Sequence, residues 1–243
     1  MSGPPRLPLP PATLPPITPT LWTTDLWRIQ NGMVIIVGRT YPAPRYRFDA
    51  PHGEYPVLYA CASQLGTFAE VYGDRARRLG EHEGERYLVR LVPRAPLPLV
   101  DLTNVRLLAS LGLDERISVG DDYAACQAWA LALWRGVPEI AGIRYRARKA
   151  GATVANVALF LDRCGEQLTT PPDETHMLDE MEAVVLEAAD IYNLVVKLSF
   201  PGRLAKRKLL YAKRLTSISQ NRFFLAPHPF SSPSVALGQR DAV

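Results

Sequence analysis

The feature that most constrains the fold is a series of short apolar segments, rich in β-branched or aromatic residues and bounded by glycine or proline. Such segments predict β-strands, and longer segments with apolar residues at helical spacing predict helices between some of them. The helices do not follow the strands in strict alternation, so we expect an α+β fold, a single domain of mixed sheets with interspersed helices. The expected strands are 32–38, 55–62, 86–92, 97–102, 141–148, 156–162 and 193–200, and the expected helices are 66–79 (beginning near Thr67), 121–136 and 173–193, the last being the longest.

The chain divides into three parts by composition. Residues 1–20 contain eight prolines, which exclude helix or sheet interior and predict a flexible or polyproline-like lead. The folded domain is expected over 21–216. Residues 217–243 are polar and interrupted by proline, which predicts a loosely ordered tail.

Composition excludes several classes of protein. No run approaches the ~18 apolar residues of a membrane helix, and the N-terminus lacks the basic-then-apolar order of a secretory signal. The three cysteines are widely spaced, which argues against a disulfide framework or a zinc site. We therefore expect a cytoplasmic protein without a metal and without contact with a membrane.

The formal net charge of +4 is modest, and much of it comes from the segment 202–214, where six of thirteen residues are Lys or Arg. This segment could contact phosphates, which keeps a nucleic-acid-binding or interaction protein open as an alternative function. A solvated helix face explains the same pattern better, so direct binding of nucleic acid is not expected.

Four side chains are candidates for chemistry. Arg28 follows a tryptophan in an apolar stretch, where an arginine must either reach solvent or meet an anion. Arg47 lies in the turn before the strand that contains Tyr59, and Glu70 follows a small-residue segment. For Tyr59 a core tyrosine with a satisfied hydroxyl remains open, and for Glu70 an acid favoured by a helix N-terminus.

Common catalytic motifs are missing. The chain contains no GxGxxG, GxxxxGK[ST] or GxSxG element, and its four histidines match no metal or triad pattern. The sequence "GDD" at 120–122 resembles a metal-binding acid pair, but it stands where a helix N-cap is expected, and capping is the better interpretation.

Taken together, these segments resemble the RES-domain family, named for its arginine, glutamate and serine. "LWRI" is similar to the opening arginine motif, and "RYRFDAPHGEYPVLYACASQLGTFAEV" to the turn, the Tyr-ending strand and the glutamate helix of the family. "DDYAACQAWA", "AGIRYRAR" and "NVALFLDR" resemble the following helix, the serine-bearing strand and the next strand. The resemblance covers 26–163, and the spacings of 31 residues from Arg28 to Tyr59 and 11 from Tyr59 to Glu70 are similar to those of the family.

The resemblance implies an ADP-ribosyltransferase-like fold and an enzyme that consumes NAD as a substrate, with no resident cofactor. NAD would be cleaved at the nicotinamide–ribose bond, by water or phosphate, or its ADP-ribose transferred to a protein. Glu70, Arg28 and Tyr59 are the implied catalytic residues. Arg47, Tyr145 and Asn156 are the implied NAD-binding residues. Glu70 would stabilise the positive charge that builds up on the sugar, the two arginines would hold the pyrophosphate, and Tyr59 would stack on the nicotinamide.

The resemblance also implies a biological setting, with the chain as the toxin of a toxin–antitoxin pair, an Xre-type antitoxin as partner, and a possible homo-oligomer. The chain departs from the family in two places. Arg45 and Tyr46 replace paired glycines, and Asp49 replaces an asparagine. The family serine falls at Ala147, so a catalytically weakened binding module is an alternative, unless Ser63 or water supplies the missing hydroxyl.

Overall fold

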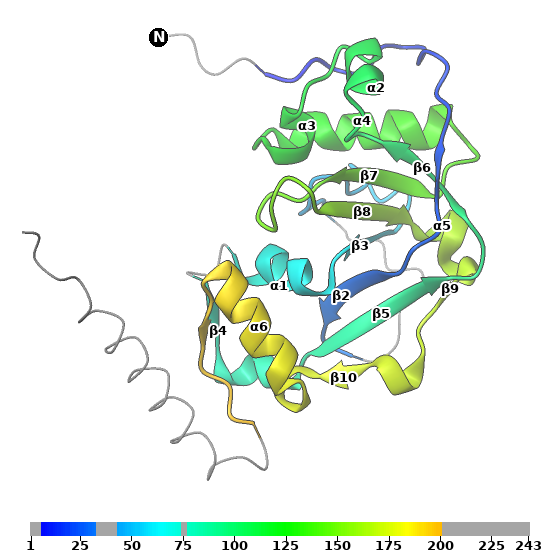
Figure 1. Cartoon of the computed structure of the whole chain (residues 1–243). Coiled ribbons are helices and arrows are strands. Elements are labelled where there is room, and N and C mark those ends of the chain that lie inside the picture. Colours follow the sequence, from blue (N-terminus) through cyan, green and yellow to red (C-terminus); the bar gives the residue numbers. More distant parts are fainter. Residues whose placement is uncertain (1–5, 33–42, 74–76, 201–243) are drawn as a thin grey trace, which may run out of the picture. The chain divides into compact units, whose positions relative to one another are not determined.

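A mixed β-sheet organises residues 6–32, 43–73 and 77–200, which are the residues that the computed structural model describes (Figure 1). Within them, nine strands form one sheet in the order β1-β6-β7-β8-β3-β2-β5-β10, with β9 paired to β5. Only β6 and β7 run parallel; the other pairs in this sheet are antiparallel. Its strands are β1 (Thr20–Trp22), β2 (Leu26–Gln30), β3 (Val57–Cys61), β5 (Tyr87–Pro93), β6 (Leu97–Asp101), β7 (Gly142–Arg146), β8 (Ala155–Phe160), β9 (Leu168–Thr169) and β10 (His176–Met177), while β4 (Arg78–Leu79) and β11 (Val195–Val196) form a separate parallel pair.

Six α-helices and four short 3-10 helices lie between the described strands. They are α1 (Gln64–Tyr72), η1 (Glu81–Glu85), α2 (Val105–Ser110), α3 (Arg116–Val119), α4 (Tyr123–Gly136), α5 (Leu161–Cys164), η2 (Gly165–Gln167), η3 (Pro172–Glu174), η4 (Leu178–Glu180) and α6 (Glu182–Tyr192). The side chain of Asp122 accepts a hydrogen bond from the Ala125 amide at the start of α4, so the acidic pair at 121–122 includes the expected helix cap.

The two faces of the sheet bury different clusters, because successive side chains of a strand point to opposite sides. On β3, Val57 and Tyr59 pack against a cluster that includes the fully buried Trp129 of α4. Leu58 and Ala60 point to the other face and join a second cluster. Neighbouring residues of β3 therefore serve different parts of the core.

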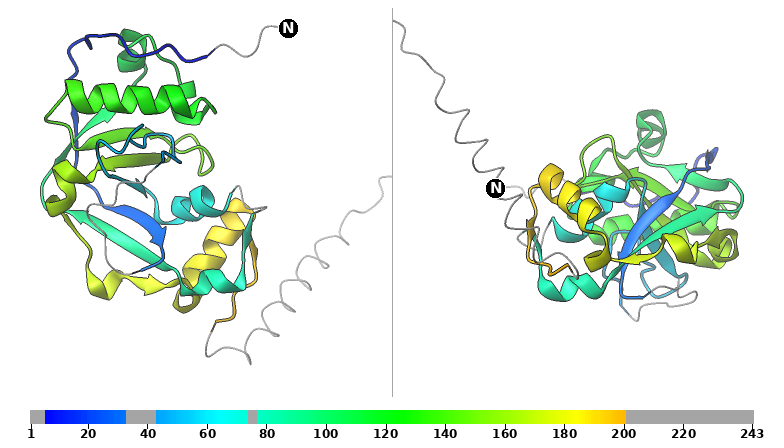
Figure 2. Two further views of the ribbon diagram at one scale, coloured as in Figure 1. Left: turned by 180° about the vertical axis from the view of Figure 1, so that it is seen from behind. Right: turned by 60° about the horizontal axis from the view of Figure 1, so that its bottom comes forward.

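A third cluster joins α1 and α6 to β2 and β5. Phe68 and Tyr72 of α1 meet Val185 and Ala188 of α6, and Leu88 contributes from β5. Figure 1 and both views of Figure 2 show α1 and α6 side by side. The C-terminal end of α6 is thereby held close to α1.

The expected α+β class is confirmed, with a curled mixed sheet and interspersed helices. Helix α1 begins at Gln64, three residues before the expected start, because Ser63 caps it by accepting a hydrogen bond from the Gly66 amide. The expected strand at 32–38 falls almost entirely outside the described residues.

The prediction of one long helix over 173–193 is wrong. Residues 172–181 form 3-10 turns and the short strand β10, whose backbone pairs with Leu88 and Tyr87 at the edge of the sheet. Only 182–192 are helical, so α4 with 14 residues is the longest described helix. Of the strand expected at 193–200, only Val195 and Val196 pair.

The proline-rich segment contains neither helix nor strand from residue 6 to residue 19, as its composition predicts. Its described part is nevertheless packed on the core. Leu7 is buried, and the Pro8 carbonyl accepts a hydrogen bond of 2.7 Å from the Trp129 indole. The flexibility of this lead stays a prediction, and the tail at 217–243 lies outside the described residues.

Candidate functional site

Glu70 lies in the last turns of α1, and its carboxylate is bound by the β7–β8 hairpin. Oε1 accepts hydrogen bonds from the backbone amides of Lys149 (2.7 Å) and Ala150 (3.2 Å), and Oε2 accepts one from Asn156 Nδ2 (2.9 Å). The side chain is half-buried. Because no acid stands in the first turn of α1, the interpretation of Glu70 as an acid placed by the helix N-terminus is not supported.

The hairpin presents its amides to Glu70 because the β7–β8 ladder ends before the turn. The last hydrogen bond between the two arms of the hairpin before the turn runs from the Ala147 amide to Val154 O, at 2.9 Å. Gly151 has φ of +102°, a backbone conformation that favours glycine, and its carbonyl accepts from the Val154 amide. The amides of Lys149 and Ala150 therefore do not pair between the two strands and donate to the Glu70 carboxylate instead.

Asn156 and Tyr145 lie beside Glu70 on one face of the sheet. They are direct partners in the β7–β8 register, and Asn156 also pairs with Cys61 of β3. Both side chains are buried. Burial raises the pKa of the Tyr145 phenol well above its ordinary value, and the negative Glu70 raises it further while Arg47 lowers it. Tyr145 is thus a neutral phenol near enough to both Glu70 and Arg47 to be influenced by their charges.

Four hydrogen bonds link the Tyr59 hydroxyl, the Asp49 carboxylate and the backbone amides of the turn at 45–49. The Tyr59 hydroxyl accepts from the Phe48 amide (2.9 Å) and donates to Asp49 Oδ1 (2.9 Å). Asp49 Oδ2 accepts from the amides of Arg45 and Tyr46, each at 2.8 Å. Burial, followed by the charge of Asp49, raises the pKa of Tyr59. The hydroxyl is satisfied within the protein, as expected for a core tyrosine.

Arg47 is buried in the same turn. Its Nη1 donates to the Ile117 carbonyl (3.4 Å) and to Cys126 Sγ (3.5 Å), and its guanidinium lies 4.8 Å from the centre of the Tyr123 ring. Within the part of the chain that the structure describes, no carboxylate forms an ion pair with Arg47. A buried cation without a counter-charge is costly, so this arginine is suited to an anionic ligand.

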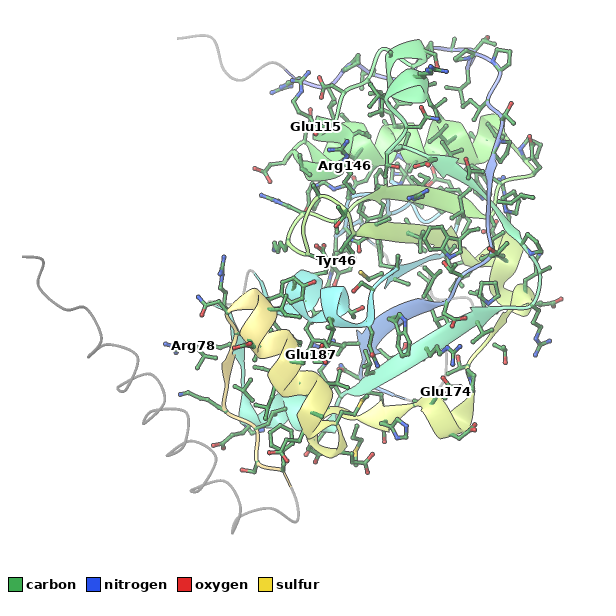
Figure 3. The ribbon with its side chains drawn as sticks, viewed as in Figure 1. Tyr46, Arg78, Glu115, Arg146, Glu174 and Glu187 are labelled. Atoms are coloured by element: carbon green, nitrogen blue, oxygen red, sulfur yellow. The ribbon has the colours of Figure 1, made fainter. Side chains whose placement is uncertain are left out.

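The ring of Phe48 connects this turn to Tyr145, because the two centroids are 4.9 Å apart in an edge-to-face contact. Tyr46 is 52% exposed, and its ring centre lies 5.5 Å from that of Tyr59. In the projection of Figure 3, Tyr46 lies between α1 and the β7–β8 hairpin. The exposed aromatic ring of this turn is therefore Tyr46.

Arg28 lies on a different face of the sheet. Trp27 and Ile29 of β2 pack against the α1–α6 cluster, so the intervening Arg28 projects to the opposite side, with Leu26. Since Trp27 pairs with Cys61, it shares its face with Tyr59 and Asn156. The structure thus brings Glu70, Asn156 and Tyr145 together, and it places Arg47 in the turn to which Tyr59 of β3 is hydrogen-bonded. Arg28 points away from them.

Ala147 is buried at the end of the hairpin with Ala69 and Ala150, and Val154 and Tyr192 pack against these alanines. The position therefore carries no hydroxyl. Ser63, the alternative source of one, already caps α1.

Two features next to Glu70 had no signal in the sequence. The amides of Lys149 and Ala150 leave no signature in the sequence, because every residue except proline carries one. Tyr192 lies at the end of α6, far from Glu70 in the sequence, and only the packing of α1 against α6 brings the two residues close together.

Among the described residues, no group of three or more His, Cys, Asp and Glu side chains could hold a metal ion. No helix in the described ranges is long and apolar enough to cross a membrane.

Comparison with known proteins supports one family. A chain of the M. tuberculosis MbcT–MbcA toxin–antitoxin complex has a similar fold, with a TM-score of 0.53 and 22% identity over 66% of this chain and 87% of that one. No curated protein matches the chain. The model of the RES domain family matches residues 25–179, well over half of the sequence. The chain belongs to the RES domain family, and its mixed sheet agrees with the ADP-ribosyltransferase-like fold expected for that family.

Proposed function

We propose that this protein cleaves the nicotinamide–ribose bond of NAD and acts as the toxin of a toxin–antitoxin pair. The arrangement around Glu70 carries the proposal. A carboxylate offers about four acceptor positions, and the hairpin fills two on Oε1 and one on Oε2. One acceptor position of Oε2 is left for a substrate hydroxyl, on a side chain whose direction is already fixed.

The chemistry follows from the charge of that oxygen. As the nicotinamide leaves, it takes the electrons of its bond to the sugar and becomes neutral, while positive charge develops on the ribose. The Glu70 carboxylate stabilises this charge and holds a ribose hydroxyl. Water then bonds to the sugar carbon and releases a proton, giving ADP-ribose. Phosphate, or a side chain of a target protein, would take the place of water in the two related reactions.

The buried arginine accounts for the other end of the substrate. The pyrophosphate of NAD would supply the counter-charge that Arg47 lacks among the described residues, through charge-assisted hydrogen bonds. Arg28 projects from the opposite face of β2, so we assign the pyrophosphate to Arg47. The partner would be an antitoxin protein, by analogy with the solved complex.

The test is the release of nicotinamide from NAD by the purified full chain. We expect Glu70→Gln to lower the rate by about 100-fold or more, because it removes the charge that stabilises the transition state. Glu187→Gln is the matched control, since Glu187 is an exposed residue of α6 (Figure 3) and undergoes the same chemical change. Equal rates for the two variants would overturn the proposal.

A second candidate, a binding module with weak or no turnover, is favoured by Ala147, which places a methyl group where the family serine is expected. This candidate predicts that the protein binds NAD without releasing nicotinamide, and that Ala147→Ser gains turnover. Release by the natural sequence at a rate that Ala147→Ser does not increase would reject it.

A further inference from the structure

Tyr192 is the last residue of α6, and the end of the helix fixes its position. Asn193 follows in the left-handed conformation, with φ of 52°, and its amide donates to the Ala189 carbonyl. The Leu194 amide donates to the same carbonyl at 2.9 Å. This helix stop is a common one. The backbone of Tyr192 is therefore held by the helix on one side and by its cap on the other.

The ring of Tyr192 lies next to the Glu70 site. It packs against the cluster of Ala69, Ala147 and Ala150. Ala69 precedes Glu70 in α1, and Ala150 donates its amide to the Glu70 carboxylate. The small side chains of the three alanines leave room for an aromatic ring. The tyrosine thus touches both elements that position the glutamate.

The hydroxyl of Tyr192 is available as a donor. Burial raises the pKa of Tyr192, and the neighbouring Cys61 and Glu70 raise it further, so the phenol stays protonated at neutral pH. Within the described ranges, no protein group forms a hydrogen bond with this hydroxyl. The ring is half-buried, in contrast to Tyr59, whose hydroxyl is engaged on both sides.

We propose that Tyr192 binds the substrate at Glu70 by donating a hydrogen bond from its phenol to the ribose. This inference rests on the proposed function. A ribose hydroxyl is both a donor and an acceptor, so it can donate to the open position of Glu70 Oε2 and accept from Tyr192. The two side chains, one from α1 and one from α6, would then hold the sugar from two elements that already pack together.

The test compares Tyr192→Phe with Tyr87→Phe. Each variant removes one phenolic oxygen and keeps the ring, and Tyr87 lies in β5, where it packs against the second core cluster. We measure the Kd of NAD by calorimetry and the KM and kcat of nicotinamide release, and we check folding by thermal melting. One hydrogen bond corresponds to about a three- to tenfold change. We expect Tyr192→Phe to weaken NAD binding by this factor with an unchanged melting temperature, and Tyr87→Phe to bind like the natural protein.

The outcomes separate this inference from the proposed function. If Glu70→Gln abolishes release while Tyr192→Phe binds and turns over NAD as Tyr87→Phe does, the role of Tyr192 is wrong and the function stands. If Tyr192→Phe loses affinity only in proportion to a lower melting temperature, the residue is structural and the inference is also wrong. If the natural protein neither binds nor cleaves NAD, both are overturned.

Discussion

Replacement of Tyr59 by phenylalanine should destabilise the protein, because its hydroxyl holds the turn at 45–49. The ring stays, but two hydrogen bonds of 2.9 Å are lost, one from the Phe48 amide and one to the Asp49 carboxylate. Phe48 and Asp49 are 0% and 4% exposed, so water does not readily replace the lost partner. A neutral bond contributes about 1 kcal/mol and a bond to a charged group about 2 kcal/mol, which gives a loss of about 3 kcal/mol.

The assay is thermal unfolding followed by circular dichroism. For a domain of this size, a loss of about 3 kcal/mol lowers the Tm by about 6–12 °C. Tyr87→Phe again serves as the control, and its Tm should be unchanged. If Tyr59→Phe melts like the natural protein, the hydroxyl does not stabilise the turn. A normal Tm combined with lost NAD cleavage would show that the hydroxyl acts on the substrate instead.

Two further predictions concern the hairpin and the pH dependence of stability. Gly73→Ala should lower both stability and nicotinamide release, because an added Cβ would lie 2.4 Å from a carbonyl of α1 and 2.7 Å from the side chain of Lys149, in the turn that positions Glu70. The control is Gly80→Ala, which should change neither property because the space around Gly80 is open. Equal effects of the two variants would contradict this prediction. Burial raises the pKa of Cys61 to about 11 and of Cys164 to about 12, from an ordinary 9.0. As the pH rises, these thiols lose their protons first in the unfolded chain, so the free energy of unfolding, measured by urea titration, should fall between about pH 9 and 12. A constant free energy of unfolding over this range would contradict the raised pKa values of the two buried thiols.

Much of the fold was predictable, because the strands and α4 have strong local patterns. The strand around Tyr59 is short, apolar and bounded, and α4 has an acidic cap at Asp122 and an alanine-rich interior. The helical pattern at 173–181 was misleading, since its backbone found partners at the edge of β5. Local spacing cannot show that a neighbouring strand competes for these hydrogen bonds.

The site was predictable only in part. Glu70 lies on the expected helix, and Asn156 and Tyr145 lie beside it. Motifs that follow one another in the same order as in a known family indicate that their residues share the family's spatial arrangement. Arg28 projects away from them because side chains alternate along a strand. The sequence alone does not say which face Arg28 occupies, since this depends on the pairing of Trp27 with Cys61. Backbone donors and contacts between α1 and α6 depend on tertiary structure alone.

NAD binding at Glu70 is tested most directly by a crystal structure of the full chain with a non-hydrolysable NAD analogue in which carbon replaces the ribose ring oxygen. We predict that a hydroxyl of the nicotinamide-side sugar lies within about 3.2 Å of Glu70 Oε2, with the pyrophosphate at Arg47. An analogue bound on the opposite face of β2, or a Glu70 carboxylate that contacts only the hairpin while the sugar lies elsewhere, would show that Glu70 does not bind the substrate.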